Sequence, residues 1–271
     1  MLDKKRFCNR CGRDHEPRIC EIGEDVDIHP SAIINVSERL VIGHGTKILA
    51  HAKLEGRSVV IGRECFFHEY SWIGGGGCFD SFSHLVIGDW FHLGRFAHIN
   101  TATQVIIGDQ VGIGHQSSVW THGGYLPADQ GFPHTVRPTV IGNNVWIPHA
   151  WVNPGVSIGN DVVVAAMSLV NRDIMDGCFA YGVPVRIRNF EKPETPFKYI
   201  VEFLNCRDIR ISSFDESRGI IKISDVEFDL RHRMIIGKVT EESEKTKDLL
   251  RRMGIRFRYK AGKEFYEEWE D

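Results

Sequence analysis

The sequence predicts an all-β fold, a parallel solenoid of about seven coils, between residues 22 and 190. An Ile-Gly step recurs along this stretch, and apolar residues follow it after about six and about twelve positions. A six-residue period inside a super-period near eighteen fits neither a helix nor simple strand alternation. It fits a coil with three short faces, each closed by one inward anchor. The anchors are Ile22, Ile28, Ile34; Ile42, Ile48, Leu54; Ile61, Phe67, Ile73; Ile87, Leu93, Ile99; Ile107, Ile113, Val119; Ile141, Ile147, Val152; Ile158, Val164, Val170.

Small residues occupy a second inward position two residues before one anchor of each coil. An interior filled by stacked aliphatic side chains leaves room there for a small group only. Gly, Asn and Asp follow many first anchors, where the backbone must turn and some residues adopt a positive φ. Both patterns support the same register. The small residues are Ala32, Ala52, Ser71, Ala97, Ser117, Ala150 and Ser168.

Three regions follow along the 271 residues. Residues 1–21 form a Cys-rich lead-in, residues 22–190 the β-helix, and residues 191–271 a small α+β appendage. The appendage begins with EKPETP, a linker by its proline and charge content. Beyond it, IIKIS, VEFDL and IRFRY are predicted strands, and EESEKTKDLLRRM is a predicted amphipathic helix.

Two insertions interrupt the regular coils. The step from Ile61 to Ile87 is 26 residues and the step from Ile107 to Ile141 is 34, against 17 to 20 elsewhere. Both insertions follow a third anchor, Ile73 or Val119, and therefore leave the solenoid from the same edge. Long loops on a compact scaffold are usually functional, so we expect the site at this edge.

Composition limits the functional classes. The chain is 42% hydrophobic and 25% charged with a net charge of −3, which argues against nucleic acid or an anionic membrane as the main partner. The start MLDKKRFCNRC contains no apolar stretch typical of a signal peptide. We therefore expect a cytoplasmic protein whose seven cysteines are reduced thiols or metal ligands.

The segment IGNNVWIPHAWVNPGVSIGNDVVVAAMSLVNRDIMDGCFAYGVPVRIR, residues 141–188, resembles the hexapeptide-repeat acyltransferases. It is most similar to the closing segment of sugar O-acetyltransferases of the galactoside and maltose acetyltransferase type. The resemblance covers roughly residues 22–190. It implies a left-handed parallel β-helix, a homotrimer with sites between neighbouring subunits, and transfer of an acyl group, usually acetyl, from coenzyme A to a sugar hydroxyl or amino group.

The same resemblance implies the site residues. His122, in Trp120-Thr121-His122 at the root of the long insertion, is the expected general base, because a group with a pKa near neutrality is needed to deprotonate the acceptor. Asn100, one coil below, is expected to position the acceptor. The segment also departs from the family, since Pro148-His149 stands where Gly-Ser is usual, and proline has no N–H to donate. Residues expected near coenzyme A are His149, Ala150, Ala166, Ser168, Asn171, Arg172, Arg186 and Arg188.

A zinc site is expected in the lead-in. Cys8, Cys11, His15 and Cys20 offer four ligands, with Cys8 and Cys11 in a C-x2-C spacing. A segment too short for its own core gains stability from a bound metal. Reduced, reactive thiols without metal remain the other interpretation.

Two functions of other classes stay open. A γ-class carbonic anhydrase uses the same fold with three histidine ligands between subunits, although the expected His-x4-His spacing is missing, since six residues separate His115 from His122. A metal bound at a subunit interface would support that alternative. A non-catalytic β-helix that serves assembly is the second, and it predicts no binding of any acyl-CoA.

Overall fold

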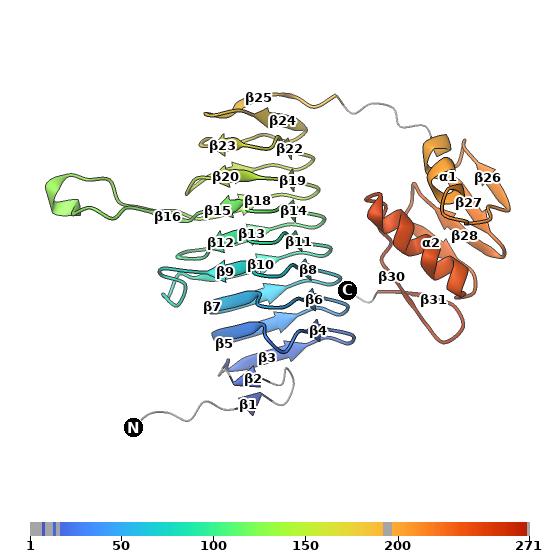
Figure 1. The fold of residues 1–271 in the computed structure, drawn as a ribbon, viewed down its shortest axis with the longest axis horizontal. Helices are drawn as coiled ribbons and strands as arrows, with labels where there is room; N and C mark the ends of the chain where they lie inside the picture. Colours follow the sequence, from blue (N-terminus) through green and yellow to red (C-terminus); the bar gives the residue numbers. More distant parts are fainter. Residues whose placement is uncertain (1–6, 9–12, 15–16, 192–196, 270–271) are drawn as a thin grey trace. The chain divides into compact units, whose positions relative to one another are not determined.

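The computed structural model describes residues 7–8, 13–14, 17–191 and 197–269, with the backbone alone at 7–8 and 13–14. Two compact units divide the chain, Met1–Glu191 and Lys192–Asp271. The first unit is a left-handed parallel β-helix, as the sequence predicts. Figure 1 shows its strands stacked coil upon coil in the order of the sequence.

Two faces of the β-helix share one sheet, because β5 and β7 bend around a corner and contribute to both. One face holds β3 (Ile19–Ile22), β10 (His84–Ile87), β13 (Val105–Ile107), β18 (Thr139–Ile141) and β21 (Ser157–Ile158). The other holds β9 (Trp72–Gly74), β12 (His98–Asn100), β15 (Ser118–Val119), β20 (Ala150–Val152) and β23 (Ser168–Val170). The two long strands are β5 (Ile33–Ile42) and β7 (Lys53–Ile61).

A second sheet forms the third face. It runs from the first coil to the last and ends in one antiparallel pair, β24 with β25. Its members are β4 (Asp27–Ile28), β6 (Lys47–Ile48), β8 (Phe66–Phe67), β11 (His92–Leu93), β14 (Gly112–Ile113), β19 (Trp146–Ile147), β22 (Val163–Val164), β24 (Cys178–Tyr181) and β25 (Arg186–Asn189).

The interior confirms the predicted register. All the predicted anchors from Ile34 onward are buried, and Ile22 and Ile28 are partly buried against the same core. The predicted small inward residues are buried as well. Each Ile-Gly step has a packing reason, since a Cβ added at Gly43 or Gly62 would lie 2.5 Å from backbone of the next coil. Close stacking of coils therefore requires glycine at this corner.

Two insertions leave the β-helix at one edge. The first follows β9, and the second begins with β16 (His122–Gly123) and returns through β17 (Thr135–Val136), an antiparallel pair with a 3-10 turn, η1 (Ala128–Gln130), between them. Figure 1 shows this second insertion as an arm that projects from the stack of coils. In register, β9, β12 and β15 are neighbours. The prediction that both insertions leave from one edge is therefore confirmed.

The N-terminal lead-in contains β1 (Phe7–Cys8) and β2 (Arg13–Asp14), which pair antiparallel. Of the four predicted zinc ligands, Cys11 and His15 lie outside the described residues, and the side chain of Cys8 is not described. Cys20 lies in β3. The zinc site stays a prediction.

The second unit has its own core and consists of two helices, a four-stranded antiparallel sheet and a hairpin. The predicted strands IIKIS and VEFDL and the predicted helix are present, whereas IRFRY is irregular up to Arg258 and only Tyr259 enters a strand. Neither described helix is long and apolar enough to cross a membrane. The elements are α1 (Phe197–Asn205), β26 (Ser213–Asp215), β27 (Ile220–Ile223), β28 (Val226–Asp229), β29 (Met234–Ile236), α2 (Glu241–Arg252), β30 (Tyr259–Ala261) and β31 (Tyr266–Glu268).

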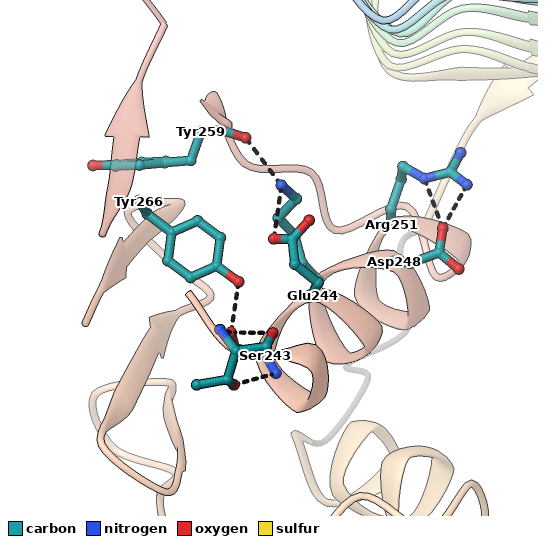
Figure 2. A network of polar contacts seen from close by, with 8 residues as sticks. Ser243, Glu244, Asp248, Arg251, Tyr259 and Tyr266 are labelled. Carbon is teal, nitrogen blue, oxygen red and sulfur yellow. Dashed lines mark hydrogen bonds and ion pairs between the residues drawn. The ribbon is translucent and has the colours of Figure 1, made fainter. Parts of the chain in front are cut away.

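A buried serine ties α2 to the terminal hairpin. The Ser243 N–H donates to Thr240 Oγ1 at 3.0 Å and the Thr240 N–H donates to Ser243 Oγ at 2.9 Å, a capping box that satisfies two backbone donors at the helix start. Tyr266 donates its hydroxyl to the same Ser243 Oγ at 2.8 Å (Figure 2). Burial raises the pKa of Tyr266, so this hydroxyl keeps its proton.

Candidate active site

His122 stands where the long insertion leaves the β-helix. Its neighbour Thr121 is fully buried, and the Thr121 carbonyl accepts from the Arg137 N–H at 2.9 Å where the arm returns. Trp120 donates its backbone N–H to the Val152 carbonyl of the next coil at 3.0 Å. Ordered backbone therefore holds both roots of the insertion, and the imidazole projects from a fixed point at the surface of the coils.

Asn100 orients the imidazole. His122 Nδ1 and Asn100 Oδ1 are 2.8 Å apart, and because an amide oxygen can only accept, Nδ1 carries the proton. Thr121 Oγ1 donates to the same oxygen at 2.6 Å. Nε2 is then the unprotonated nitrogen of the neutral ring, and it has no hydrogen-bond partner within the described part of the chain. This is the protonation state that a general base requires.

The amide nitrogen of Asn100 is also engaged. Asn100 Nδ2 donates to the carbonyl of Gly74 at 3.1 Å and to that of Gly76 at 3.4 Å, both in the first insertion. The side chain is fully buried. The buried amide is therefore closed to direct contact with an acceptor, and its geometry favours a role in orienting His122; that Asn100 positions the acceptor stays a prediction.

An aromatic ladder runs past the imidazole on the outer face of the same sheet. The ring centroids of Trp72 and His98 are 4.4 Å apart, those of His98 and Trp120 5.0 Å, and those of Trp120 and Trp151 5.2 Å. The ring of His122 lies 5.8 Å from that of Trp120. Burial lowers the pKa of His98, which keeps this second imidazole neutral beside His122.

A pocket of about 850 Å³ opens beside His122, between the base of the arm and the next coils. Aromatic and apolar side chains form most of its wall, and Asn153, Asn171 and Arg137 add polar groups. Among the described residues that line it there is no carboxylate. A thioester attached to a phosphorylated carrier fits this chemistry, because an apolar wall accepts the acyl arm and a guanidinium attracts phosphate.

The structure separates the eight residues expected near coenzyme A. Asn171 lines the pocket beside His122, and the other seven are not among its lining residues. Ala150 and Ser168 are buried inward positions, and the Ser168 hydroxyl donates to the Ala165 carbonyl at 2.8 Å, so neither side chain can meet a ligand. Both side chains fill the interior of the coil, and the expected place of these residues near coenzyme A stays a prediction.

The remaining expected residues lie at the surface of the last coils. His149 Nδ1 lies 2.9 Å from the carbonyl of His115, one coil away. The Arg188 guanidinium lies 5.0 Å from the ring centroid of Phe179. Ala166, Arg172 and Arg186 are exposed. Basic groups are therefore available along these coils, as phosphate binding would need.

Two contributors to the site were not expected from the sequence. Thr121 helps to fix Asn100, and Trp151 extends the aromatic wall of the pocket. The signal for Trp151 was present, because it stands between the inward residues Ala150 and Val152 and must therefore point outward. For Thr121 the sequence carried no signal beyond its place before His122.

Comparison with known proteins assigns the family. No family model matches the chain. The galactoside O-acetyltransferase of Escherichia coli is 51% identical over 51 residues, which are 18% of this chain and 25% of that protein. A Saccharomyces cerevisiae protein named as a proposed acetyltransferase is 33% identical over 141 residues, 46% of this chain and 71% of its own length. Among solved structures, a hexapeptide-repeat-containing acetyltransferase of Vibrio cholerae is 25% identical, with a TM-score of 0.36, over 56% of this chain and 74% of that one.

Proposed function

Because the chain belongs to the hexapeptide-repeat acetyltransferases, we propose that it transfers an acyl group, in the first place acetyl, from coenzyme A to a hydroxyl or amino group of a sugar or nucleotide sugar. One observation supports this most: Asn100 Oδ1 accepts from His122 Nδ1, which leaves Nε2 open beside a pocket. The pocket, with Arg137 and Asn171 in its wall, is the proposed place of the acyl-CoA.

In the proposed mechanism, acyl-CoA supplies the thioester carbon that the acceptor attacks. His122 Nε2 accepts the proton of the acceptor hydroxyl or amine as its oxygen or nitrogen bonds to that carbon, and the thiolate of coenzyme A leaves. Asn100 Oδ1 stabilises the imidazolium that forms, because it accepts from the Nδ1 proton throughout. The proton on Nε2 can then pass to the departing sulfur, which restores the neutral ring.

We further propose that the protein works as a homotrimer, as its resemblance implies. The arm supports this proposal, because it carries exposed apolar side chains, with Tyr125 98% and Leu126 50% exposed. Such side chains on a projecting segment are typical of contacts with another chain. Light scattering on the purified full-length protein measures the mass directly, and a monomer at micromolar concentration would contradict the proposal.

The test of the activity is release of free thiol from acetyl-CoA in the presence of a panel of glycosides and nucleotide sugars. We expect His122→Ala and His122→Gln to lower kcat by roughly 10²- to 10⁴-fold, the contribution of a positioned general base, with unchanged affinity for acetyl-CoA. His232→Ala is the matched control, since this exposed histidine lies in the second unit. A His122→Ala protein with more than about a tenth of the wild-type kcat at neutral pH would contradict the assignment.

A further inference from the structure

The first insertion begins with four consecutive glycines, Gly74 to Gly77, and they lie against the catalytic group. Gly74 ends β9 and pairs with Asn100 in the sheet. The insertion is an ordered turn, because the Cys78 N–H donates to the Gly75 carbonyl at 3.1 Å and the Asp80 N–H to the Gly77 carbonyl at 3.0 Å. Its position next to His122 is therefore part of the fold.

Three of the four glycines are required by the backbone. Gly74, Gly75 and Gly77 have φ values of +137°, +98° and +80°, a region that residues with a side chain rarely adopt. A Cβ at each would also lie 2.9 Å from another residue: from the side chain of Glu55 at Gly74, from Asn100 Nδ2 at Gly75, and from Ala102 Cβ at Gly77. These glycines need no functional explanation.

Gly76 is different. It has no positive φ, it is exposed, and the heavy atoms that a Cβ there would meet within 4 Å are His122 Nε2 at 3.7 Å and Cε1 at 3.8 Å. These are ordinary van der Waals distances, so the fold accepts a side chain at position 76. A side chain at this position would lie directly beside the atom that takes the proton.

The two distances locate this space. A Cβ at position 76 would be almost equally far from Nε2 and Cε1 of His122. It would therefore lie beside the Nε2–Cε1 bond of the ring and not in the direction of the Nε2 lone pair. An acceptor oxygen about 2.8 Å from Nε2 places its own carbon about 3.6 Å from Nε2. Position 76 therefore borders the carbon that bears the acceptor group and the substituents of that carbon.

We propose that Gly76 is a specificity-determining residue, whose missing side chain lets an acceptor group on a ring carbon, such as a secondary sugar hydroxyl, reach His122 Nε2. The inference rests on the proposed acyl transfer and deepens it. A β-branched side chain at position 76 would collide with ring substituents beside a secondary hydroxyl. The same β-branched side chain would still leave room for an unhindered primary alcohol.

The experiment compares Gly76→Ala and Gly76→Val with wild type in the full chain. The acceptors are a methyl 6-deoxyhexopyranoside, which has secondary hydroxyls only, and 2-(hydroxymethyl)tetrahydropyran, which has one primary hydroxyl. We expect Gly76→Val to lower kcat/KM for the secondary acceptor by roughly a hundredfold, the cost of misplacing the reactants by about 1 Å, and for the primary acceptor by less than about threefold. Gly76→Ala should lie between Gly76→Val and wild type. Ser81→Val, an exposed change in the same insertion, is the control.

A second measurement does not depend on activity. Carbethoxylation of His122 by diethyl pyrocarbonate, followed by peptide mass spectrometry, reports access to Nε2, and Gly76→Val should slow it at least about threefold while Ser81→Val does not. Equal losses on both acceptors, a wild type that uses the primary alcohol alone, or an unchanged carbethoxylation rate in Gly76→Val overturns the inference. A wild type that transfers neither to these two alcohols nor to any glycoside or nucleotide sugar of the panel, with carbethoxylation slowed as expected, contradicts the proposed function and leaves position 76 as the gate to His122.

Discussion

Replacement of Asn100 by alanine tests whether this residue orients His122, the proposed general base. The change removes the oxygen that accepts from His122 Nδ1 at 2.8 Å and from Thr121 Oγ1 at 2.6 Å. It also removes the donor to the carbonyls of Gly74 and Gly76. The imidazole then has no partner that selects the tautomer with a free Nε2, and it can rotate about its side-chain bonds.

The size of the effect follows from these contacts. A neutral hydrogen bond contributes about 1 kcal/mol net, which corresponds to about a fivefold change in the population of the productive tautomer. A shift of the ring by about 1 Å can cost about a hundredfold in rate. We therefore expect kcat to fall by between about fivefold and about a hundredfold, less than the roughly 10²- to 10⁴-fold of losing the base itself. The acceptor KM should change little, because Asn100 is fully buried.

Stability changes in parallel. The Ala102 N–H, which donates to Asn100 Oδ1 at 3.2 Å, loses its partner in a buried place, and we expect the free energy of unfolding to fall by about 1–3 kcal/mol. The assay is steady-state kinetics with acetyl-CoA and varied acceptor, together with denaturant unfolding. Asn35→Ala, on the exposed face of β5, is the matched control. An increase in acceptor KM above about fivefold, with kcat within twofold of wild type, would show that Asn100 contacts the acceptor and refute its orienting role.

Four further outcomes are expected. Burial lowers the pKa of His98 from 6.5 in the folded protein. The stability that the neutral ring contributes is therefore present above about pH 6.5 and is lost as the pH falls through the lowered pKa. We expect His98→Phe to flatten the dependence of melting temperature on pH between about 5 and 7. Burial raises the pKa of Cys65 to about 12, so in the native protein a thiol reagent at neutral pH should label the exposed Cys206 and spare Cys65 until the chain unfolds. Ser243→Ala should lower the free energy of unfolding by about 1–3 kcal/mol, since it removes the oxygen that accepts from the Thr240 N–H and from the buried Tyr266 hydroxyl; an unchanged value would contradict this account. Metal analysis should find about one zinc per chain if residues 1–21 form the predicted site, and a stoichiometry far below one with reactive thiols would contradict it.

The coils could be predicted because their constraint is local and repeated. Every coil must place an aliphatic side chain on the stacked interior and a residue without a side chain where two coils touch, so the sequence repeats both. The segment IRFRY shows where such inference fails. Ile255 and Phe257 are buried in the second unit, as alternation would suggest, yet their backbone joins no sheet. An alternating pattern reports which side chains are buried and not which backbone groups pair.

The proximity of the proposed catalytic residues, His122 and Asn100, was predictable for a similar reason. His122 and Asn100 lie near the same edge in adjacent coils, so the register alone brings them close together. The partner of each hydrogen bond could not be predicted, because it depends on whether a side chain at a corner turns inward or outward. Asn100 turns inward and serves His122, where an outward amide would have met the acceptor.

The four glycines at positions 74–77 likewise differ in their reasons, and the sequence does not show this. Gly74, Gly75 and Gly77 are fixed by a positive φ, a constraint that would exist in a protein with no catalytic function. Gly76 lacks this constraint, and the atoms that a Cβ there would meet within 4 Å belong to the His122 ring. In the sequence the four residues are identical, and glycine shows only that a side chain is missing, not why. The atoms within 4 Å of each glycine show whether its missing side chain is required by the fold or leaves room for an acceptor. These atoms belong to coils that are far apart in the sequence, so the sequence alone does not reveal the difference.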